Sequence, residues 1–304
     1  MTSWDKKYLS ILPEVNQALQ AGRPIVALES TVITHGLPYP ENLTLAKNMQ
    51  AVIRETGAIP ATIAILEGII RVGLDEGDLE RLANIENIHK ISVRDIAPAL
   101  ALRFSGGTTV AGTLAIAQAT GIKVFATGGI GGVHRQAPFD ISADLGELTK
   151  AQVVVVCAGA KAILDIPATL EVLETNGIPV IGYQTDEFPA FYSLSSGIRV
   201  SIRVDSPKEV ADLAKTHWEL GLGGSVLVAV APPKEVALDP NNIETAIQTA
   251  LEEASEKKIH GQTVTPFLLQ RVSEITGGAS LKANLSLLLN NARLAGQIAQ
   301  YFYN

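Results

Sequence analysis

Residues 153–161 read VVVVCAGAK, a run of valines that ends in small residues and a lysine. A strand that is apolar at every position is buried on both faces, which is typical of the middle of a parallel sheet. Short apolar runs of this kind recur along the chain, separated by longer segments of helical period. We therefore expect an α/β protein, layered α/β/α, with a largely parallel central sheet. The expected strands are 24–28, 61–66, 89–92, 123–127, 152–157, 179–183, 198–204 and 225–230, and the expected helices between them are 41–56, 109–120, 160–176 and 207–220.

The C-terminal part of the chain differs from this alternating pattern. Residues 231–242 contain three prolines and no apolar period, which is typical of a loop. From residue 243 to residue 303 the period is helical only, with a break expected near Gly277 and Gly278. We expect this helical C-terminal segment to pack against the sheet, so that residues 1–304 form a single domain.

Composition excludes several classes of partner. The 304 residues include 24 Lys+Arg against 31 Asp+Glu, a net charge of -7, and a single cysteine. A mildly acidic chain without a Lys/Arg cluster lacks the positive patch that nucleic acid or an anionic membrane requires, so we expect neither partner. Cys157 alone forms no intrachain disulfide, and the sequence has no Cys/His zinc pattern. With no secretory signal and no apolar run of ~18 residues, a cytoplasmic protein is expected.

Ligands of open parallel sheets bind beyond the carboxyl ends of the strands, so the residues that follow each strand are the first candidates. Glu29 comes directly after the strand 24–28, where partial burial would make it a general acid. The alternative is a solvated loop acid or a helix cap. Lys90 lies inside the apolar run 89–92, an unusual place for a hydrated ammonium. It is either a surface lysine on an edge strand or a point charge for a phosphate.

A glycine-rich turn is expected before the helix 109–120. It consists of Gly106, Gly107, Thr108 and Thr109. Backbone N–H groups at a helix N-terminus, with hydroxyls beside them, form a site for an anion. The turn matches neither a Walker loop nor the dinucleotide fingerprint, so by itself it is weak evidence.

Residues 125–145, FATGGIGGVHRQAPFDISADL, are the densest chemical stretch in the chain. The glycines permit unusual backbone dihedrals and close approach of the backbone to a ligand. Asp140 and Asp144 offer the oxygen ligands that Mg²⁺ or Mn²⁺ prefers. The alternative is that an aspartate caps a helix that begins near Ala143.

Lys161 falls in the first turn of the helix expected at 160–176, where the positive end of the helix dipole disfavours an ammonium. The dipole and burial together favour the neutral amine, a nucleophile that forms a Schiff base with a sugar carbonyl. The alternative is a surface lysine turned towards solvent. Further along, Asn284, Asn290 and Asn291 fall in a helical run. Asparagines usually lie on a polar helix face, but a carboxamide also pairs with the amide edge of a base.

Taken in order, the motifs of this chain resemble the pseudouridine 5'-phosphate glycosidase family, which includes the indigoidine synthase A-like proteins. The likeness runs from about residue 24 to residue 298 and consists of ALESTVITHGLPYPENL, GGTTVAGTL, FATGGIGGVHR, FDISADL, VVCAGAKAILD, GYQTDEFPAFY, TPFLL and LKANLSLLLNNARLA. The resemblance implies reversible cleavage of the carbon–carbon glycosidic bond of pseudouridine 5'-phosphate to uracil and ribose 5-phosphate. It also implies a divalent ion, typically one Mn²⁺ per subunit, and a homotrimer.

The resemblance implies roles for individual residues. Lys161 is the nucleophile that forms a covalent adduct with the ring-opened ribose, Glu29 the proton donor and Asp140 the protein ligand of the metal. This route suits the substrate, because a carbon-linked uracil is a poor leaving group for the usual glycosidase mechanism. The expected phosphate contacts are Lys90, Thr108, Thr109 and Ser142. The other expected substrate contacts are Val110, Ala143, Asp144, His134 and Asn284.

Two features depart from the family pattern. The loop 135–139 is about two residues short, which affects closure over the metal, and Val93 stands where a more polar residue is common. Other classes of function also remain open at this point. The protein could be another lysine-dependent sugar-phosphate lyase or aldolase, or a sugar-phosphate kinase that turns over only with ATP. It could also be a non-catalytic module that binds a nucleotide or sugar phosphate.

Overall fold

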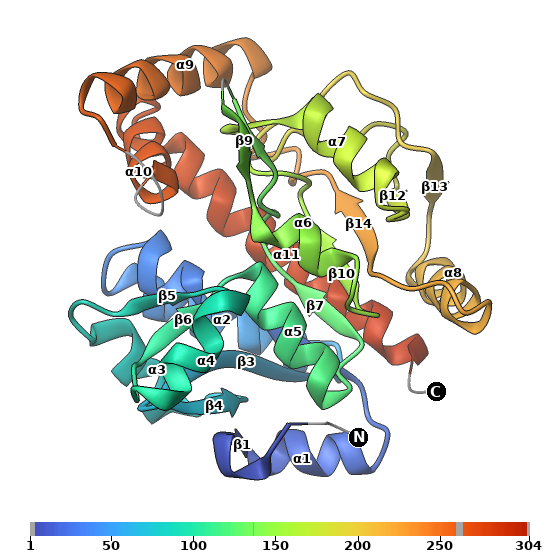
Figure 1. Ribbon diagram of the computed structural model, residues 1–304. Coiled ribbons are helices and arrows are strands. Elements are labelled where there is room, and N and C mark those ends of the chain that lie inside the picture. The colour runs from blue at the N-terminus through green and yellow to red at the C-terminus, as the bar shows by residue number, and fades with distance from the viewer. Residues whose placement is uncertain (1–3, 136, 260–263, 303–304) are drawn as a thin grey trace.

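The strands fall into a large sheet and a small one. The computed structural model describes residues 4–135, 137–259 and 264–302. Its strands are β1 (Leu9–Ile11), β2 (Ile25–Leu28), β3 (Ile59–Leu66), β4 (Ile69–Val72), β5 (His89–Ile91), β6 (Gly106–Thr108), β7 (Val124–Ala126), β8 (Val133–His134), β9 (Ala137–Ile141), β10 (Val154–Cys157), β11 (Leu164–Asp165), β12 (Val180–Tyr183), β13 (Ile202–Val204) and β14 (Val226–Val230). The 11-stranded sheet runs β1-β4-β3-β2-β7-β10-β14-β12-β13, with β6 joined to β3 and β5 to β6 (Figure 1). The small sheet has the order β11-β8-β9.

The middle of the large sheet is parallel and buried on both faces. Strands β2, β7, β10 and β14 pair in parallel, one beside the next. Every residue of these four strands is buried, because helices cover the sheet on both sides. The expected α/β class with a largely parallel sheet is confirmed, and each expected strand is present, although that at 198–204 is limited to Ile202–Val204. The antiparallel exceptions pair β3 with β4 and with β6.

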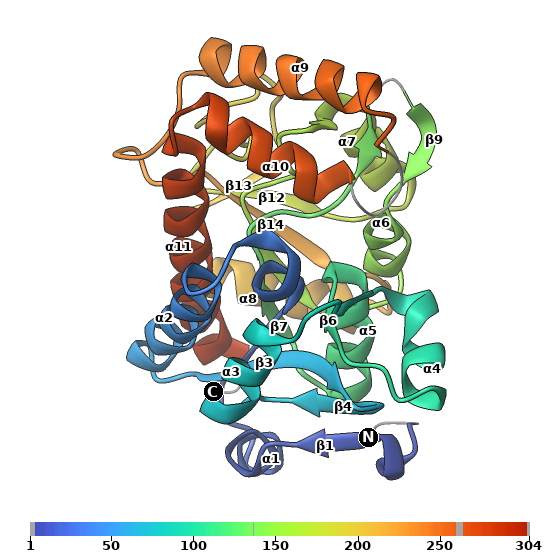
Figure 2. The same cartoon turned by 90° about the vertical axis from the view of Figure 1, so that its left-hand side faces the viewer.

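Helices cover both faces of the sheet. They are α1 (Pro13–Gln20), α2 (Glu41–Glu55), α3 (Glu76–Asn84), α4 (Val93–Ala101), α5 (Val110–Thr120), α6 (Ala143–Leu148), α7 (Ile166–Thr175), α8 (Pro207–Glu219), α9 (Pro240–Glu256), α10 (Val264–Ile275) and α11 (Ala279–Phe302). Figure 2 shows α2 and α11 on one side of the sheet and α4, α5 and α6 on the other. A continuous cluster of buried apolar side chains runs from Val15 of α1 to Ala299 of α11.

The C-terminal segment is helical, as expected. Helix α9 begins at Pro240, three residues earlier than expected, because the Asp239 side chain accepts hydrogen bonds from the backbone N–H groups of Asn241 and Asn242 and caps the helix. The break falls where expected, since Gly277 and Gly278 have φ angles of 58° and 85° between α10 and α11. Helix α11 packs along β2, β7 and β10. The C-terminal helices therefore form part of the main core.

Two local predictions are wrong. The glycine-rich turn expected at 106–109 is largely a strand, β6, which pairs with β3 and β5. The helix expected from residue 160 begins only at Ile166, where the Asp165 side chain caps it by accepting from the N–H of Ala168. An earlier start would have put Pro167 inside the helix, where its ring clashes with the preceding turn.

Some elements were not expected from the sequence. Strands β1 and β4 extend the sheet at one edge, the small sheet has the order β11-β8-β9, and α1, α3 and α4 are short helices. Helix α6 begins at Ala143, as expected. None of the helices formed by the described residues combines the length and the apolar character needed to cross a membrane.

Candidate active site

Two adjoining cavities lie at the carboxyl ends of β2, β7 and β10. The inner cavity is lined by Val32, His35, Phe191, Leu269, Asn284 and Leu288. The outer cavity is lined by Thr109, Val110, His134, Asp140, Ser142 and Asp144. Both cavities share a wall, which we call the junction, formed by Glu29, Thr31, Lys90, Lys161 and Thr265. The parallel register of the three strands brings residues more than a hundred positions apart to this one edge of the sheet.

Glu29 follows β2 directly and is half-buried. The Thr127 hydroxyl, at the end of β7, donates a 2.6 Å hydrogen bond to Glu29 Oε1. Burial raises the pKa of the Glu29 carboxyl, although Lys161 and the Thr127 hydroxyl both act in the opposite direction. A carboxyl that holds its proton to higher pH than usual is suited to general acid catalysis. The alternative of a solvated loop acid does not fit this position.

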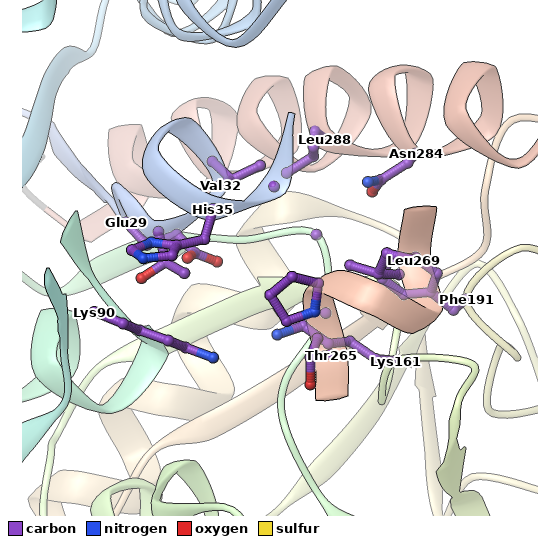
Figure 3. A pocket seen from close by; sticks show the side chains of 15 residues that line it. Glu29, Val32, His35, Lys90, Lys161, Phe191, Thr265, Leu269, Asn284 and Leu288 are labelled. Carbon is purple, nitrogen blue, oxygen red and sulfur yellow. The ribbon is translucent and has the colours of Figure 1, made fainter. Parts of the chain in front are cut away.

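Lys90 lies in β5, which pairs with β6 alone among the described residues, so the edge-strand alternative is correct for its backbone. Its side chain nevertheless reaches into the junction (Figure 3). Burial lowers the pKa of the Lys90 amine, and the positive charge of the nearby Lys161 lowers it further. The two lysines approach the junction from opposite sides, next to Glu29 (Figure 3).

Lys161 does not lie in a helix, so the predicted position in a first helical turn is wrong and no helix dipole acts on its amine. It occupies an irregular segment between β10 and β11, five residues before α7 begins. Its backbone N–H donates to the Ile130 carbonyl at 3.1 Å, and its own carbonyl accepts from the Leu164 N–H at 3.0 Å. The side chain lines both cavities, so the alternative of a lysine turned towards solvent is wrong.

The N-terminus of α5 opens into the outer cavity. Thr109 caps this helix, and its hydroxyl accepts from the Gly112 N–H at 3.2 Å. The Ala111 N–H donates to Asp144 Oδ1 at 2.9 Å. The first four N–H groups of a helix have no intrahelical partner, and no hydrogen bond of the Val110 N–H is seen among the described residues. Val110 lines the outer cavity with that N–H group at the positive end of the helix, which favours an anion.

Asp144 is a buried carboxylate that joins three segments. Its Oδ1 accepts from Ala111, its Oδ2 accepts from the Gly131 N–H at 2.8 Å, and the side chain is only 6% exposed. The cap of α6 is Ser142, whose hydroxyl accepts from the Asp144 N–H at 3.2 Å. Neither Asp140 nor Asp144 caps α6. The Asp144 carboxylate instead holds α6 against α5 and against the glycine loop, residues 128–132 between β7 and β8.

Asp140 lies exposed on β9 and lines the outer cavity. Within the ranges described, its carboxylate has no hydrogen bond or ion pair, and His, Cys, Asp and Glu residues form no group of three or more that could hold a metal. A closed tetrahedral zinc site would need such a group. A hard divalent cation that keeps several waters needs only one or two carboxylates, so the single free carboxylate of Asp140 fits Mg²⁺ or Mn²⁺.

The glycines between β7 and β8 allow close packing against other parts of the protein. They are not needed for unusual backbone dihedrals. A Cβ at Gly131 would lie 2.2 Å from Ser142 Oγ, and one at Gly129 would lie 2.6 Å from Phe191 Cε2. Neither glycine has a positive φ. Phe191 does, at 62°, a strained conformation for an aromatic residue, and its ring forms one wall of the inner cavity (Figure 3).

The remaining expected contacts divide between the two cavities, except for Thr108. His134 on β8 and Ala143, the first residue of α6, line the outer cavity, and Asn284 on α11 lines the inner one. Thr108 is fully buried, and its hydroxyl donates to the Ile63 carbonyl at 2.7 Å. It lines neither cavity, since β6 turns its side chain into the core.

Comparisons with known proteins identify the family. Residues 14–301 match the sequence profile of the family described as indigoidine synthase A like protein. The chain belongs to the indigoidine synthase A like family. Two relatives of this chain are named pseudouridine-5'-phosphate glycosidase. That of Petrotoga mobilis is 56% identical over 97% of each chain, and that of Geobacillus kaustophilus is 54% identical over 96% of this chain and 98% of its own. The resemblance found in the sequence is confirmed.

Two solved structures share the indigoidine synthase A like fold. The prealnumycin C-glycosynthase AlnA, in complex with ribulose 5-phosphate, superimposes with a TM-score of 0.91 at 40% identity over 98% of both chains. An indigoidine synthase A-like protein from Thermotoga maritima gives 0.90 at 37% identity over 97% of both chains.

Several lining residues of this indigoidine synthase A like chain were not singled out from the sequence. They are His35, Phe191, Thr265, Leu269 and Leu288. His35 belongs to the motif ITHG, residues 33–36, shortly after Glu29. Burial lowers the pKa of its imidazole, and the charge of Lys90 acts in the same direction. The available signals were the motifs FPAFY and TPFLL, which matched the family without a chemical role of their own.

Proposed function

We propose that this chain cleaves the carbon–carbon glycosidic bond of pseudouridine 5'-phosphate with water, reversibly, to give uracil and ribose 5-phosphate. The observation that carries the proposal is the junction, where Glu29, Lys90 and Lys161 lie together between the inner and the outer cavity. Relatives of 50–56% identity named for this activity support it.

The two cavities suit the two ends of such a substrate. The inner cavity offers apolar walls for a flat base and the Asn284 carboxamide, which can both donate to and accept from an imide edge. The outer cavity offers the Val110 N–H, the Thr109 and Ser142 hydroxyls, and the Lys90 ammonium for a phosphate. The sugar then spans the junction, with C1' beside Lys161.

The reaction begins with ring opening. Glu29 gives its proton to the ribose ring oxygen as the bond from that oxygen to C1' breaks, and the electron pair of the bond stays on the oxygen. The neutral amine of Lys161 bonds to C1', and the Glu29 carboxylate takes the proton that the amine releases. The raised pKa of Glu29 suits both transfers, because the carboxyl must be protonated at the start.

The carbon–carbon bond breaks in the next step. The nitrogen electron pair of Lys161 forms a C=N bond to C1', the electrons of the glycosidic bond move to C5 of uracil, and Glu29 protonates that carbon. Water then hydrolyses the imine, which frees the lysine, returns a proton to Glu29 and releases open-chain ribose 5-phosphate. Covalent catalysis of this kind replaces one difficult step by two easier ones.

We also propose that Asp140 holds one divalent ion, with Mn²⁺ the first choice. The Asp140 carboxylate, which makes no hydrogen bond or ion pair with the described residues, supports this assignment, and the ion would supply positive charge and oriented waters there. A homotrimer, implied by the resemblance, stays a prediction that light scattering can measure.

A second candidate is synthesis of a C-glycoside, because the AlnA neighbour is named a C-glycosynthase and was solved with ribulose 5-phosphate. The same lysine chemistry run in reverse joins an acceptor carbon to the sugar. The kinase, aldolase and binding-module alternatives have no comparable support.

The test is release of uracil from pseudouridine 5'-phosphate by metal-stripped protein, with and without Mn²⁺, beside Lys161→Ala. Metal-dependent release that is lost in the variant supports both the reaction and the nucleophile. Absence of uracil with every divalent ion tried would reject the proposed substrate.

A further inference from the structure

The segment that carries Lys161 has no helix to hold it in place. Residues 158–163 are irregular, and they rest on the glycine loop through hydrogen bonds from Ala158 to the Gly128 carbonyl at 2.8 Å and from Ile130 to the Gly159 carbonyl at 3.0 Å. These contacts fix the segment before Lys161. The position of a reacting amine also depends on what holds the chain after it.

Arg135 holds that second part, together with the pairing of β11 to β8. Its Nη2 donates to the Ala162 carbonyl at 3.0 Å, and its Nε donates to the Leu164 carbonyl at 3.1 Å. The same guanidinium forms a two-pronged ion pair with Glu244 of α9. The Arg135 side chain is 23% exposed, so these hydrogen bonds compete little with water. The guanidinium thus links Ala162, the residue after Lys161, to helix α9.

We propose that Arg135 is a positioning residue for Lys161. Three nitrogens of its planar fork are used at once, a geometry that lysine cannot reproduce. Without the fork, the carbonyls of Ala162 and Leu164 lose the hydrogen bonds that Arg135 donates, and the segment gains freedom at Lys161, whose amine must lie within bonding distance of C1'. A misplacement of about 1 Å from a change away from the chemistry costs on the order of a hundredfold in rate. The catalytic part of this inference rests on the function proposed above.

Glu244 has a supporting role. It is 55% exposed and lies on α9, which packs against α10, the helix whose Thr265 lies at the junction. Glu244→Gln removes the charge partner of Arg135 but leaves the hydrogen bonds to Ala162 and Leu164 possible. Glu244→Gln should therefore speed amide exchange of the Lys161 segment as loss of Arg135 does, but by a smaller factor.

The chain offers a matched control in Arg271. Its guanidinium makes a comparable forked pair with Glu253 of α9, at 2.8 and 2.9 Å, and its side chain is 34% exposed. Arg271 contacts no part of the Lys161 segment in the described hydrogen bonds. Arg135→Lys and Arg271→Lys therefore remove the same kind of interaction, one beside Lys161 and one remote from it.

Two measurements on the full chain test the proposal. The first is hydrogen exchange of the backbone amides in residues 158–165, which needs no substrate. Arg135→Lys should speed exchange of this segment by about tenfold, Glu244→Gln by less, and Arg271→Lys should leave it as in the wild type. Unchanged exchange in Arg135→Lys, or equal acceleration in Arg271→Lys, would overturn the proposal. If Arg135→Lys does not fold, Glu244→Gln decides by the same criterion.

The second measurement is the rate at which ribose 5-phosphate is trapped on the protein by borohydride. Arg135→Lys should slow trapping by about tenfold to a hundredfold. The concentration of ribose 5-phosphate that gives half the maximal rate should stay within about twofold, because Arg135 lines neither the junction nor the outer cavity. Faster exchange with an unchanged trapping rate would show that Arg135 is structural only. A wild-type protein that traps nothing would reject the proposed chemistry, while the exchange measurement would still decide whether Arg135 holds the segment.

Discussion

The Thr127 hydroxyl donates a 2.6 Å hydrogen bond to Glu29 Oε1, and this contact joins the ends of two neighbouring parallel strands at the proposed proton donor. The bond leaves Oε2 of Glu29 to carry the proton. Thr127 is itself held by Asn291 of α11, whose Nδ2 donates to the Thr127 carbonyl at 2.9 Å. Both the direction and the acidity of Glu29 therefore depend on a residue that is not expected to touch the substrate.

Replacing Thr127 by valine should move the pH profile of the reaction. The hydroxyl stabilises the charged carboxylate, so its loss raises the pKa of Glu29 beyond the rise that burial already causes. A general acid must be protonated, so activity falls as pH rises through this pKa, and the fall should occur at higher pH in Thr127→Val. Steady-state kinetics across pH measure the change, with Thr127→Ser as control. If the fall of activity at high pH stays at the same pH in Thr127→Val, or moves to lower pH, the proposed role of Glu29 is contradicted.

Asp140→Asn should weaken binding of the divalent ion without affecting the fold. The carboxylate is exposed and supports no packing, so the midpoint of thermal unfolding should stay within about 1 °C. Loss of one charged ligand should raise the Mn²⁺ concentration for half-maximal activity by at least about tenfold. Titration of metal-stripped protein with Mn²⁺ measures this, and an unchanged half-maximal Mn²⁺ concentration would place the ion elsewhere.

Asp144→Asn should show the opposite pattern, because this carboxylate is structural. An amide has one oxygen and presents an NH₂ group to one of the two backbone N–H donors, on Ala111 or Gly131. The free energy of unfolding should fall by about 2 kcal/mol, as expected for a lost hydrogen bond to a buried charge. Chemical denaturation measures the loss, and a stability equal to that of the wild type would show that the two bonds contribute little.

Gly131→Ala should destabilise the protein by about 1–3 kcal/mol, because the new Cβ would overlap Ser142 Oγ and lie 2.8 Å from Asp144 Oδ2. Gly146→Ala is the stability control, since a Cβ there meets no atom within 4 Å and Gly146 lies within α6. Alanine at that position should be neutral or stabilise the helix. Thermal unfolding compares the two variants, and equal midpoints would contradict the close packing of the glycine loop.

A segment of this fold could be predicted where its own residues determine its structure. The valines before Cys157 predict a buried strand without further information, and Glu29 is a candidate site residue because it follows such a strand. Gly106 and Gly107 form a strand for tertiary reasons, since a Cβ at Gly106 would lie 2.4 Å from Ile91 Cγ1. No local propensity predicts that pairing. The single-domain organisation of residues 1–304 stays a prediction.

The charged residues of the site could be predicted from the sequence, but the apolar residues that line the inner cavity could not. Lys161 was selected for a position in a helix that it does not occupy, although Asp165 and Pro167 carried the signal for the later helix start. Phe191 and Leu288 line the inner cavity only because distant segments meet there. Such contacts follow from the assembled fold and leave no periodic trace in the sequence.

The most direct measurement is the identity of the lysine that bonds to the sugar. Wild-type protein is incubated with ribose 5-phosphate, reduced with borohydride and digested, and the modified peptide is found by mass spectrometry, with Lys161→Ala and Lys90→Ala treated in parallel. The account predicts one adduct, on Lys161, that is absent from Lys161→Ala and still forms in Lys90→Ala. An adduct on Lys90, or none on the wild type, would contradict it.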